Sequence, residues 1–279
     1  MMLMINTRAY NSLRPLKRGR LRLFFGKAYY SFSRYLLWYS GKYQYAKNRC
    51  MDPLPYLQFS HSTPLLRELK DVDMQYQYNK IVNLKLAVKN LDGIIIKPGE
   101  TFSYWRLIGK PTAKKGYVPG MVLYSGTFHM STGGGLCQLS NLLYWMTLHT
   151  PLTIVERYRH SYDVFPDTNR TQPFGSGATC YYPYRDLMIR NDTNTEFQLN
   201  VEIDQKNLVG KWHTNLPPRY RYEILEKEHI FKSEYWGGFS RHNKLYRKCY
   251  TLEGELADEE YITENHALMM YSPFLPSGQ

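Results

Sequence analysis

The sequence has few cysteines and no long apolar run, and both features limit what it can encode. Its 279 residues contain four widely spaced cysteines, Cys50, Cys137, Cys180 and Cys249, which is typical of reduced thiols rather than of a disulfide scaffold. No run of about 18 apolar residues is present, so we expect no membrane-spanning helix. Residues 1–20 carry only a short apolar patch before the basic residues begin, so we predict no signal peptide. We therefore expect a cytoplasmic protein or one associated with the inner face of the membrane.

Acidic residues are absent from the first 51 positions. Eleven of the 36 Lys and Arg residues lie there, whereas residues 52–279 carry 25 basic and 24 acidic side chains. The net charge of +12 therefore belongs to an N-terminal arm, residues 1–50, and not to the rest of the chain. An anionic membrane surface is one partner that such an arm could bind. No nucleic-acid-binding motif accompanies the basic residues, so we expect no nucleic-acid partner.

An apolar stripe within this arm recurs at helical spacing. Its members are Leu21, Phe24, Phe25, Ala28, Phe32, Tyr35, Leu36 and Tyr39. Because Arg22, Lys27 and Arg34 lie off the stripe, the pattern predicts a basic amphipathic helix. Two interpretations stay open at this point. The helix either lies on an anionic membrane surface or packs its stripe on the core of the protein.

The rest of the chain predicts an α+β fold of predominantly antiparallel strands with a few helices. Residues 51–75 are rich in proline and predict a linker or entry segment. We expect a core domain over residues 76–213 and a β-rich C-terminal extension over 214–279 that packs on it. Helices are predicted at 79–90 and 136–149. Strands are predicted at 93–99, 101–109, 152–159, 178–182, 185–190, 196–203 and 208–213, with a hairpin over 121–130 and a turn at 204–207.

A glycine run precedes Cys137 in the stretch STGGGLCQ, residues 131–138. Glycines tolerate positive φ and allow close approach of the backbone, here at Gly133–Gly135. A cysteine in the first turn of the following helix lies near the positive end of the helix dipole, which favours the thiolate. The free amides of that turn could hold an oxyanion, and acyl transfer would use both features. The stretch fits equally a glycine loop that leads into a core helix, with Cys137 as a small apolar side chain.

A cysteine nucleophile needs a base, and His160 is the best candidate. It ends a strand-like run, and Asp163 or Asp167 could fix its tautomer. His149 lies twelve residues after Cys137, about 18 Å along the predicted helix, and is better explained as a C-terminal cap. His129 is a weaker candidate. The Cys and His residues lack the short paired spacings of structural zinc sites, so we predict no metal and no cofactor.

Three long segments carry a resemblance to a known family. They are residues 98–123 (PGETFSYWRLIGKPTAKKGYVPGMVL), residues 133–167 (beginning GGGLCQLSNLLYW) and residues 170–193 (beginning RTQPFGSGATC). These segments resemble the VanW family, which is named after an accessory gene of vancomycin-resistance clusters, and the likeness spans roughly residues 76–213. The resemblance implies work on peptidoglycan. VanW domains of some exported cell-wall proteins are described as L,D-transpeptidases whose nucleophile is the cysteine of the GGGxCQ motif, here Cys137.

The resemblance also implies roles for individual residues. Cys137 would attack the carbonyl between the third and fourth residues of a peptidoglycan stem peptide, and His160 would take and return the proton. Backbone around the motif would bind the oxyanion, and polar side chains would hold the substrate. The residues concerned are Gly134, Gly135, Gln138, Ser140, Ser161, Arg157, Arg170, Gly175 and Gly177. Ser140 fits helix-interior packing equally well, and Arg157 and Arg170 could bind a carboxylate.

Two other functions stay open beside an L,D-transpeptidase or carboxypeptidase. One is a non-catalytic accessory protein that binds cell-wall precursors. The other is a membrane-surface scaffold that acts through residues 1–50.

Overall fold

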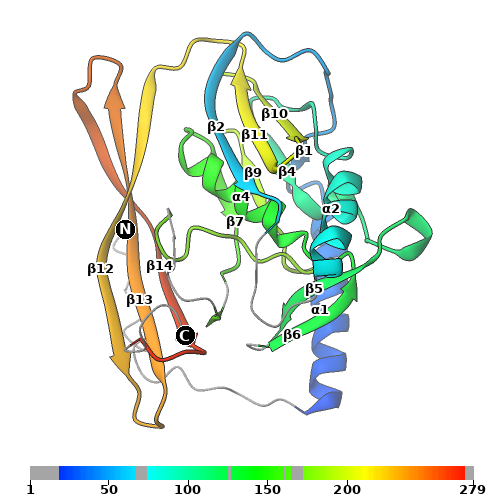
Figure 1. The fold of residues 1–279 in the computed structure, drawn as a ribbon. Helices are drawn as coiled ribbons and strands as arrows, with labels where there is room; N and C mark the ends of the chain where they lie inside the picture. Colours follow the sequence, from blue (N-terminus) through cyan, green and yellow to red (C-terminus); the bar gives the residue numbers. More distant parts are fainter. Residues whose placement is uncertain (1–18, 67–73, 125–126, 160, 165–171, 274–279) are drawn as a thin grey trace.

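The computed structural model describes residues 19–66, 74–124, 127–159, 161–164 and 172–273. A few helices and mostly antiparallel strands make up this part of the chain, which confirms the predicted α+β class (Figure 1). Two four-stranded sheets and two longer helices form the core. A separate sheet of long strands, built by the C-terminal part of the chain, lies beside it.

The first core sheet is antiparallel throughout. Its strand order is β2 (Tyr56–Pro64), β11 (Asn207–Thr214), β10 (Phe197–Ile203) and β3 (Ile94–Ile96). The predicted turn at 204–207 joins β10 to β11, and its Asp204 carboxylate accepts a hydrogen bond from the amide of Lys206 (2.7 Å). The prediction of a linker over 51–75 is wrong for residues 56–64. Prolines marked this segment as a linker, but an edge strand tolerates proline at its end because one row of its backbone groups needs no partner.

The second core sheet has the strand order β1 (Gln44–Tyr45), β4 (Glu100–Ser103), β9 (Met188–Arg190) and β7 (Thr153–Glu156). The strand predicted over 101–109 is only half correct, because β4 ends at Ser103 and α3 (Tyr104–Ile108) follows. The Ser103 hydroxyl caps α3 by accepting a hydrogen bond from the Arg106 amide (3.3 Å). The strand predicted over 178–182 is irregular backbone with one bridge, between Tyr181 and Arg185.

Helix α4 (Cys137–Leu148) packs against the first sheet and is buried on most of its surface. It contacts β2 and β11, where Gly210 allows a close approach: a Cβ atom on Gly210 would lie 2.4 Å from the sulfur of Met146. Helix α2 (Met74–Val88) lies beside the hairpin of β5 (Pro119–Tyr124) and β6 (Thr127–Thr132). Both helices and this hairpin match the predictions, and a short 3₁₀ turn, η2 (Ala113–Lys115), precedes the hairpin.

The C-terminal strands form their own sheet rather than extending a core sheet. β12 (Tyr220–Ser233), β13 (Phe239–Thr251) and β14 (Leu256–Met269) are antiparallel, and the short β8 (Tyr162–Asp163) pairs parallel with the end of β14. Side chains also attach this sheet to the core. Asn243 donates a hydrogen bond to the Phe174 carbonyl (2.7 Å), and Arg247 donates to the Thr150 carbonyl.

Helix α1 (Arg20–Tyr39) lies at one edge of the core and extends below it in Figure 1. Arg34 and Trp38 are its buried residues. Most of the apolar stripe predicted for this helix is exposed, although the Tyr35 hydroxyl lies 3.0 Å from that of Tyr182 and Arg106 lies over the Tyr39 ring. The interpretation that the stripe packs on the core is therefore wrong for most of its length. None of the helices among the described residues is both long enough and apolar enough to span a bilayer.

Candidate functional site

The glycine loop before α4 has the backbone conformation that the sequence predicts. Gly133 and Gly135 have φ angles of +79° and +89°, in the left-handed region that favours glycine. The close approach, however, is to the protein itself. A Cβ atom on Gly134 would lie 2.1 Å from the carbonyl of Gly120, and one on Gly135 would lie 2.3 Å from Cγ of Lys80. The glycines therefore let the loop pack against β5 and α2.

Asn83 of α2 holds this loop in place, and sequence reasoning missed it. Its side-chain amide nitrogen donates hydrogen bonds to the carbonyls of Gly134 (2.9 Å) and Val118 (3.0 Å). Its side-chain oxygen accepts a hydrogen bond from the Val118 amide (2.9 Å), and the side chain is fully buried. Such a residue ties helix, hairpin and glycine loop together. An asparagine among the apolar positions of a helix is the signal that could have identified it.

Cys137 is the first residue of α4, and its residue surface is half-buried. Burial raises the pKa of the thiol above its ordinary value of 9.0, although hydrogen bonds from the amides of Cys137 and Gln138 and the nearby Lys80 ammonium favour the thiolate. The expectation of a lowered pKa is therefore wrong for the surroundings that the structure describes. The helix terminus acts as predicted, but desolvation outweighs it. Tyr144 and Leu148, which follow Cys137 along the same face of α4, are buried as well.

Asp186 is a second buried titratable group, and the sequence did not indicate it. Asp186 accepts hydrogen bonds from the Ser103 hydroxyl (2.5 Å) and the Trp105 amide (2.9 Å). Burial raises its pKa from 3.8 to about 7. Burial raises the pKa of the Cys180 thiol, and the charge of Asp186 raises it further. Perturbed groups of this kind mark candidate functional residues, although structural networks also produce them.

The predicted base lies outside the described residues, and so do Asp167 and Arg170. Asp163 is described, but its partners belong to the C-terminal part of the chain. Its carboxylate accepts hydrogen bonds from Arg241 (3.2 Å) and the Tyr271 hydroxyl (2.9 Å). These contacts give Asp163 a role in attaching the C-terminal sheet. Its orienting role toward His160 stays a prediction.

His149 ends α4 as predicted. Its Nδ1 lies 3.0 Å from the Trp145 carbonyl, and its ring stacks on Phe59 at 4.0 Å. Burial lowers the pKa of His149 to about 4, so the ring is neutral at pH 7. His129 is exposed on β6, beside the hydroxyl of Thr127 (2.9 Å).

Two of the predicted substrate-binding residues make contacts within the protein. The Gln138 amide donates hydrogen bonds to the Thr63 hydroxyl (3.0 Å) and the Pro64 carbonyl (2.9 Å), which fixes the end of β2 to α4. The fully buried Ser140 donates to the Ala178 carbonyl (2.7 Å). The Ser140 contact agrees with the interpretation of this residue as helix-interior packing.

Arg157 contacts two of the other predicted site residues, Gly175 and Gly177. Its Nε donates to the Gly177 carbonyl (2.9 Å), and its Nη2 donates to the Gly175 carbonyl. Its Nη1 donates to the side-chain oxygen of Asn265 (3.1 Å), and the guanidinium lies 4.7 Å from the Tyr144 ring centroid. A Cβ atom on Gly175 would lie 2.1 Å from the Asn265 side chain. The guanidinium thus holds the loop of residues 172–180 between α4 and β14.

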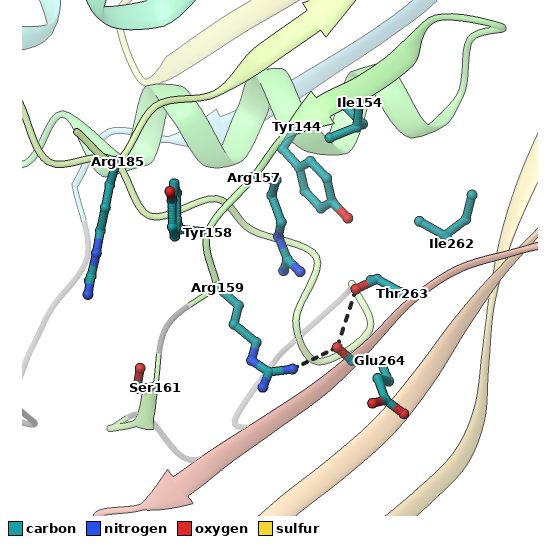
Figure 2. Close-up of a pocket in the computed structure, with 10 residues that line it drawn as sticks. All are labelled: Tyr144, Ile154, Arg157, Tyr158, Arg159, Ser161, Arg185, Ile262, Thr263 and Glu264. Atoms are coloured by element: carbon teal, nitrogen blue, oxygen red, sulfur yellow. Dashed lines mark hydrogen bonds between the residues drawn. The ribbon is translucent and has the colours of Figure 1, made fainter. Parts of the chain in front are cut away.

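A pocket of about 450 Å³ lies between the segment after β7 and strand β14 (Figure 2). Three arginines contribute to its wall, and we call it the arginine pocket. Its lining residues are Tyr144, Ile154, Arg157, Tyr158, Arg159, Ser161, Arg185, Ile262, Thr263 and Glu264. Ser161 and Arg157 were predicted as substrate-binding residues, whereas Arg159 and Arg185 were not. The alternation of Arg157 and Arg159 at i and i+2 is the strand-like signal that could have paired them.

The arginine pocket has an uneven distribution of charge. Arg159 donates a hydrogen bond to the backbone carbonyl of Glu264 (2.8 Å), and the Glu264 carboxylate lies 3.2 Å from His266 (Figure 2). Burial lowers the pKa of Arg159, and the charge of Glu264 raises it. Arg185 is exposed, 5.8 Å from the Tyr158 ring centroid, and its guanidinium makes no hydrogen bond to any residue that the structure describes. Guanidinium groups bind carboxylates and phosphates in bidentate geometry. The pocket therefore suits an anionic ligand.

The arginine pocket and Cys137 occupy different positions on the same face of α4. Tyr144 follows Cys137 by seven residues, which is about 10 Å along a helix axis. Asn141 lies between them and accepts a hydrogen bond from the Ala178 amide (2.8 Å). The loop of residues 172–180 therefore contacts α4 between the thiol and the pocket.

Comparison with known proteins places these features in a family. A family described as "VanW like protein" matches residues 79–213. The chain is 37% identical over 228 residues to the vancomycin B-type resistance protein VanW of Enterococcus faecalis, across 81% of this chain and 82% of that protein. It is 32% identical over 112 residues to the uncharacterized protein YoaR of Bacillus subtilis, across 40% of this chain and 35% of that protein. No solved structure matches the chain significantly.

Proposed function

This chain belongs to the VanW family, and from that premise we propose that it acts on the stem peptides of peptidoglycan or its precursors by acyl transfer at Cys137. A relative that shares most of its length is named for resistance to vancomycin, and we extend that association to this chain. The observation that carries the chemical part is the position of the thiol. Burial raises the pKa of this thiol, but its place at the N-terminus of α4 puts it beside the Cys137 and Gln138 amides and the Lys80 cation, which favour the thiolate.

The proposed reaction begins with loss of the thiol proton to a base, for which His160 is the candidate. The sulfur then forms a bond to the carbonyl carbon between the third and fourth residues of the stem peptide. The resulting oxyanion would lie beside the Cys137 amide at the start of α4, because the Gln138 and Leu139 amides donate to the carbonyls of Gly135 (3.2 Å) and Leu136 (3.1 Å). Cleavage of the C–N bond releases D-alanine, whose amine takes the proton, and leaves a thioester on Cys137. An amine of a second stem peptide or water then takes the acyl group and restores the thiol.

The arginine pocket supplies a binding site for the charged part of the same substrate. We assign the stem-peptide carboxylate to Arg185 and Arg159. The loop of residues 172–180 would border the bound peptide, and its Gly175 and Gly177 stay in the proposal as backbone that flanks the substrate.

Mass spectrometry of the intact protein after incubation with stem tetrapeptides and pentapeptides tests the reaction. We expect an acyl adduct that maps to Cys137 and is absent from the Cys137→Ala variant. The Cys50→Ala variant is the matched control and should form the adduct as the native chain does, because Cys50 is exposed and far along the chain. Formation of the adduct on another cysteine, or no adduct in any variant while peptide binding is retained, would contradict the proposal.

Binding without chemistry is the second candidate, and the raised pKa of Cys137 favours it. In this case the protein recognises the anionic part of a cell-wall precursor through Arg185 and leaves it unchanged. Calorimetry with a stem peptide distinguishes the two functions. A binding protein keeps its affinity as Cys137→Ala and loses it as Arg185→Ala. Lys206→Ala is a control, because Lys206 lies in the turn after β10, away from the arginine pocket.

A further inference from the structure

Helix α1 carries a continuous apolar face that the described protein leaves exposed. The side chains of Leu21, Phe24, Phe25 and Phe32 are 75%, 67%, 66% and 63% exposed. Leu36 and Tyr39 continue the same face at helical spacing and are also exposed. Figure 1 shows α1 extending beyond the core. Single apolar residues scattered over a protein surface are common, but a continuous group of large apolar side chains indicates an interaction surface.

The helix cannot turn this face toward the core, because its opposite face is already fixed there. The Arg34 guanidinium forms an ion pair with Glu156 and donates a hydrogen bond to the Tyr184 carbonyl (3.1 Å). The Trp38 indole donates to the Ser103 hydroxyl (3.2 Å). Breaking the buried ion pair would strand a charge in the interior, which is strongly unfavourable. The exposed face is thus a fixed feature of the fold.

The basic residues beside the apolar face of α1 indicate which kind of surface that face binds. Arg20 and Arg22 lie beside the apolar stripe, and residues 1–51 contain eleven basic and no acidic residues. An amphipathic helix with aromatic and aliphatic residues on one face and basic residues beside them suits the interface of an anionic bilayer, where the apolar side chains enter the acyl region and the cations contact the headgroups. A second copy of the chain is a poor occupant, because a symmetric contact would bring two uncompensated basic arms together.

We propose that α1 lies in the plane of an anionic lipid surface, with Phe24, Phe25 and Phe32 in the bilayer interface. This inference is independent of the chemistry at Cys137. It places the Arg34 and Trp38 contacts, and with them the core of the protein, at the membrane surface. Of the two interpretations of the apolar stripe, it selects an anionic membrane surface over packing on the core of the protein.

Sedimentation with lipid vesicles tests the proposal on the full chain. We expect binding to vesicles of equimolar phosphatidylcholine and phosphatidylglycerol, and little binding to phosphatidylcholine alone. The double variant Phe24→Ala, Phe25→Ala should bind about tenfold more weakly, since each phenylalanine loses apolar area that enters the bilayer. The double variant Arg20→Gln, Arg22→Gln should weaken binding on the order of tenfold, and only to the anionic vesicles.

The control is the double variant Tyr235→Ala, Leu252→Ala, which removes two equally exposed apolar side chains (76% and 68%) from turns of the C-terminal sheet. It should bind vesicles as the native chain does. Circular dichroism establishes that each variant folds. Equal loss in the control, equal binding to neutral vesicles, or a concentration-dependent dimer that Phe24→Ala, Phe25→Ala abolishes without any vesicle binding would each overturn the proposal.

Discussion

At the scale of single residues, Cys137 shows two opposing electrostatic effects at one atom. Backbone amides and Lys80 favour the thiolate, while burial disfavours it and is the larger effect. A helix N-terminus lowers a cysteine pKa only when the sulfur keeps enough polar surroundings to offset desolvation. Here the first turn of α4 lies against buried groups. A base is therefore required for any chemistry at this thiol.

Alkylation kinetics test this balance. We expect iodoacetamide to modify the exposed Cys50 first and Cys137 slowly at neutral pH, with a rate at Cys137 that rises toward a pKa above 9.0. Peptide mapping over a pH series gives the rate at each cysteine. Half-maximal reaction of Cys137 below pH 8 would contradict this expectation and would mean that a group other than Lys80 and the two amides stabilises the thiolate.

Asp186 provides a second test at this scale. Because burial raises its pKa from 3.8 to about 7, the folded protein holds a proton that the unfolded chain has released between these values. The free energy of unfolding should therefore fall as pH rises from about 4 to about 7. Urea unfolding of Asp186→Asn over this range should show a flatter dependence. Asp192→Asn is the control, because Arg190 lowers the pKa of Asp192, whereas burial raises that of Asp186. An unchanged slope in Asp186→Asn would refute the assignment.

At the scale of elements, the glycine loop packs against neighbouring backbone and also determines where α4 begins. Gly134 packs on the backbone of Gly120, and the Asn83 side chain donates hydrogen bonds to the carbonyls of Gly134 and Val118. The loop therefore fixes where the first turn of α4 lies, and the carbonyls of Gly135 and Leu136 accept hydrogen bonds from the Gln138 and Leu139 amides of that turn. A cysteine placed at that turn lies beside backbone amides and Lys80, which favour its thiolate.

Two glycine substitutions separate steric from conformational cost. Gly134→Ala should destabilise the protein by about 3 kcal/mol or more, because its Cβ would lie 2.1 Å from rigid backbone. Gly99→Ala should cost only about 1–2 kcal/mol, since its φ of +79° is unfavourable for alanine but nothing lies within 4 Å. Urea unfolding measures both. Equal costs would show that the contact between Gly134 and Gly120 contributes little.

At the scale of the whole molecule, the C-terminal sheet is tied to the core by buried polar contacts. Arg241 and Asp163 form an ion pair whose side chains are almost fully buried. Arg157 reaches Asn265 of β14 while it holds the loop of residues 172–180. The arginine pocket lies at this junction, so its shape depends on both parts of the chain.

Removing one partner of that ion pair tests the coupling of the two parts. Arg241→Ala should lower the free energy of unfolding by about 3–5 kcal/mol, because Asp163 stays buried without its cation. Lys227→Ala removes an ion pair with Glu259 in the exposed part of the same sheet and should change it by less than about 1 kcal/mol. Urea unfolding followed by tryptophan fluorescence gives both values. Similar losses in the two variants would contradict a tightly coupled junction.

Local pattern alone determined much of this protein. The positive φ at Gly133 and Gly135, the helix that begins at Cys137, the hairpin over residues 119–132 and the antiparallel pair β10–β11 all follow from glycine chemistry and from side-chain periodicity. These features depend on residues that are near one another in the chain. The motif likewise marked Cys137 as the residue of chemical interest.

Only the tertiary structure decided the environment of those residues. The exposed face of α1, the strand at residues 56–64, the burial that raises the Cys137 pKa and the meeting of Arg157, Arg159 and Arg185 all depend on segments far apart in sequence. An amphipathic pattern shows that a helix has an apolar face, but which face meets the core depends on partners such as Glu156 and Ser103. Desolvation likewise depends on what surrounds an atom in space, and periodicity along the chain carries no information about that.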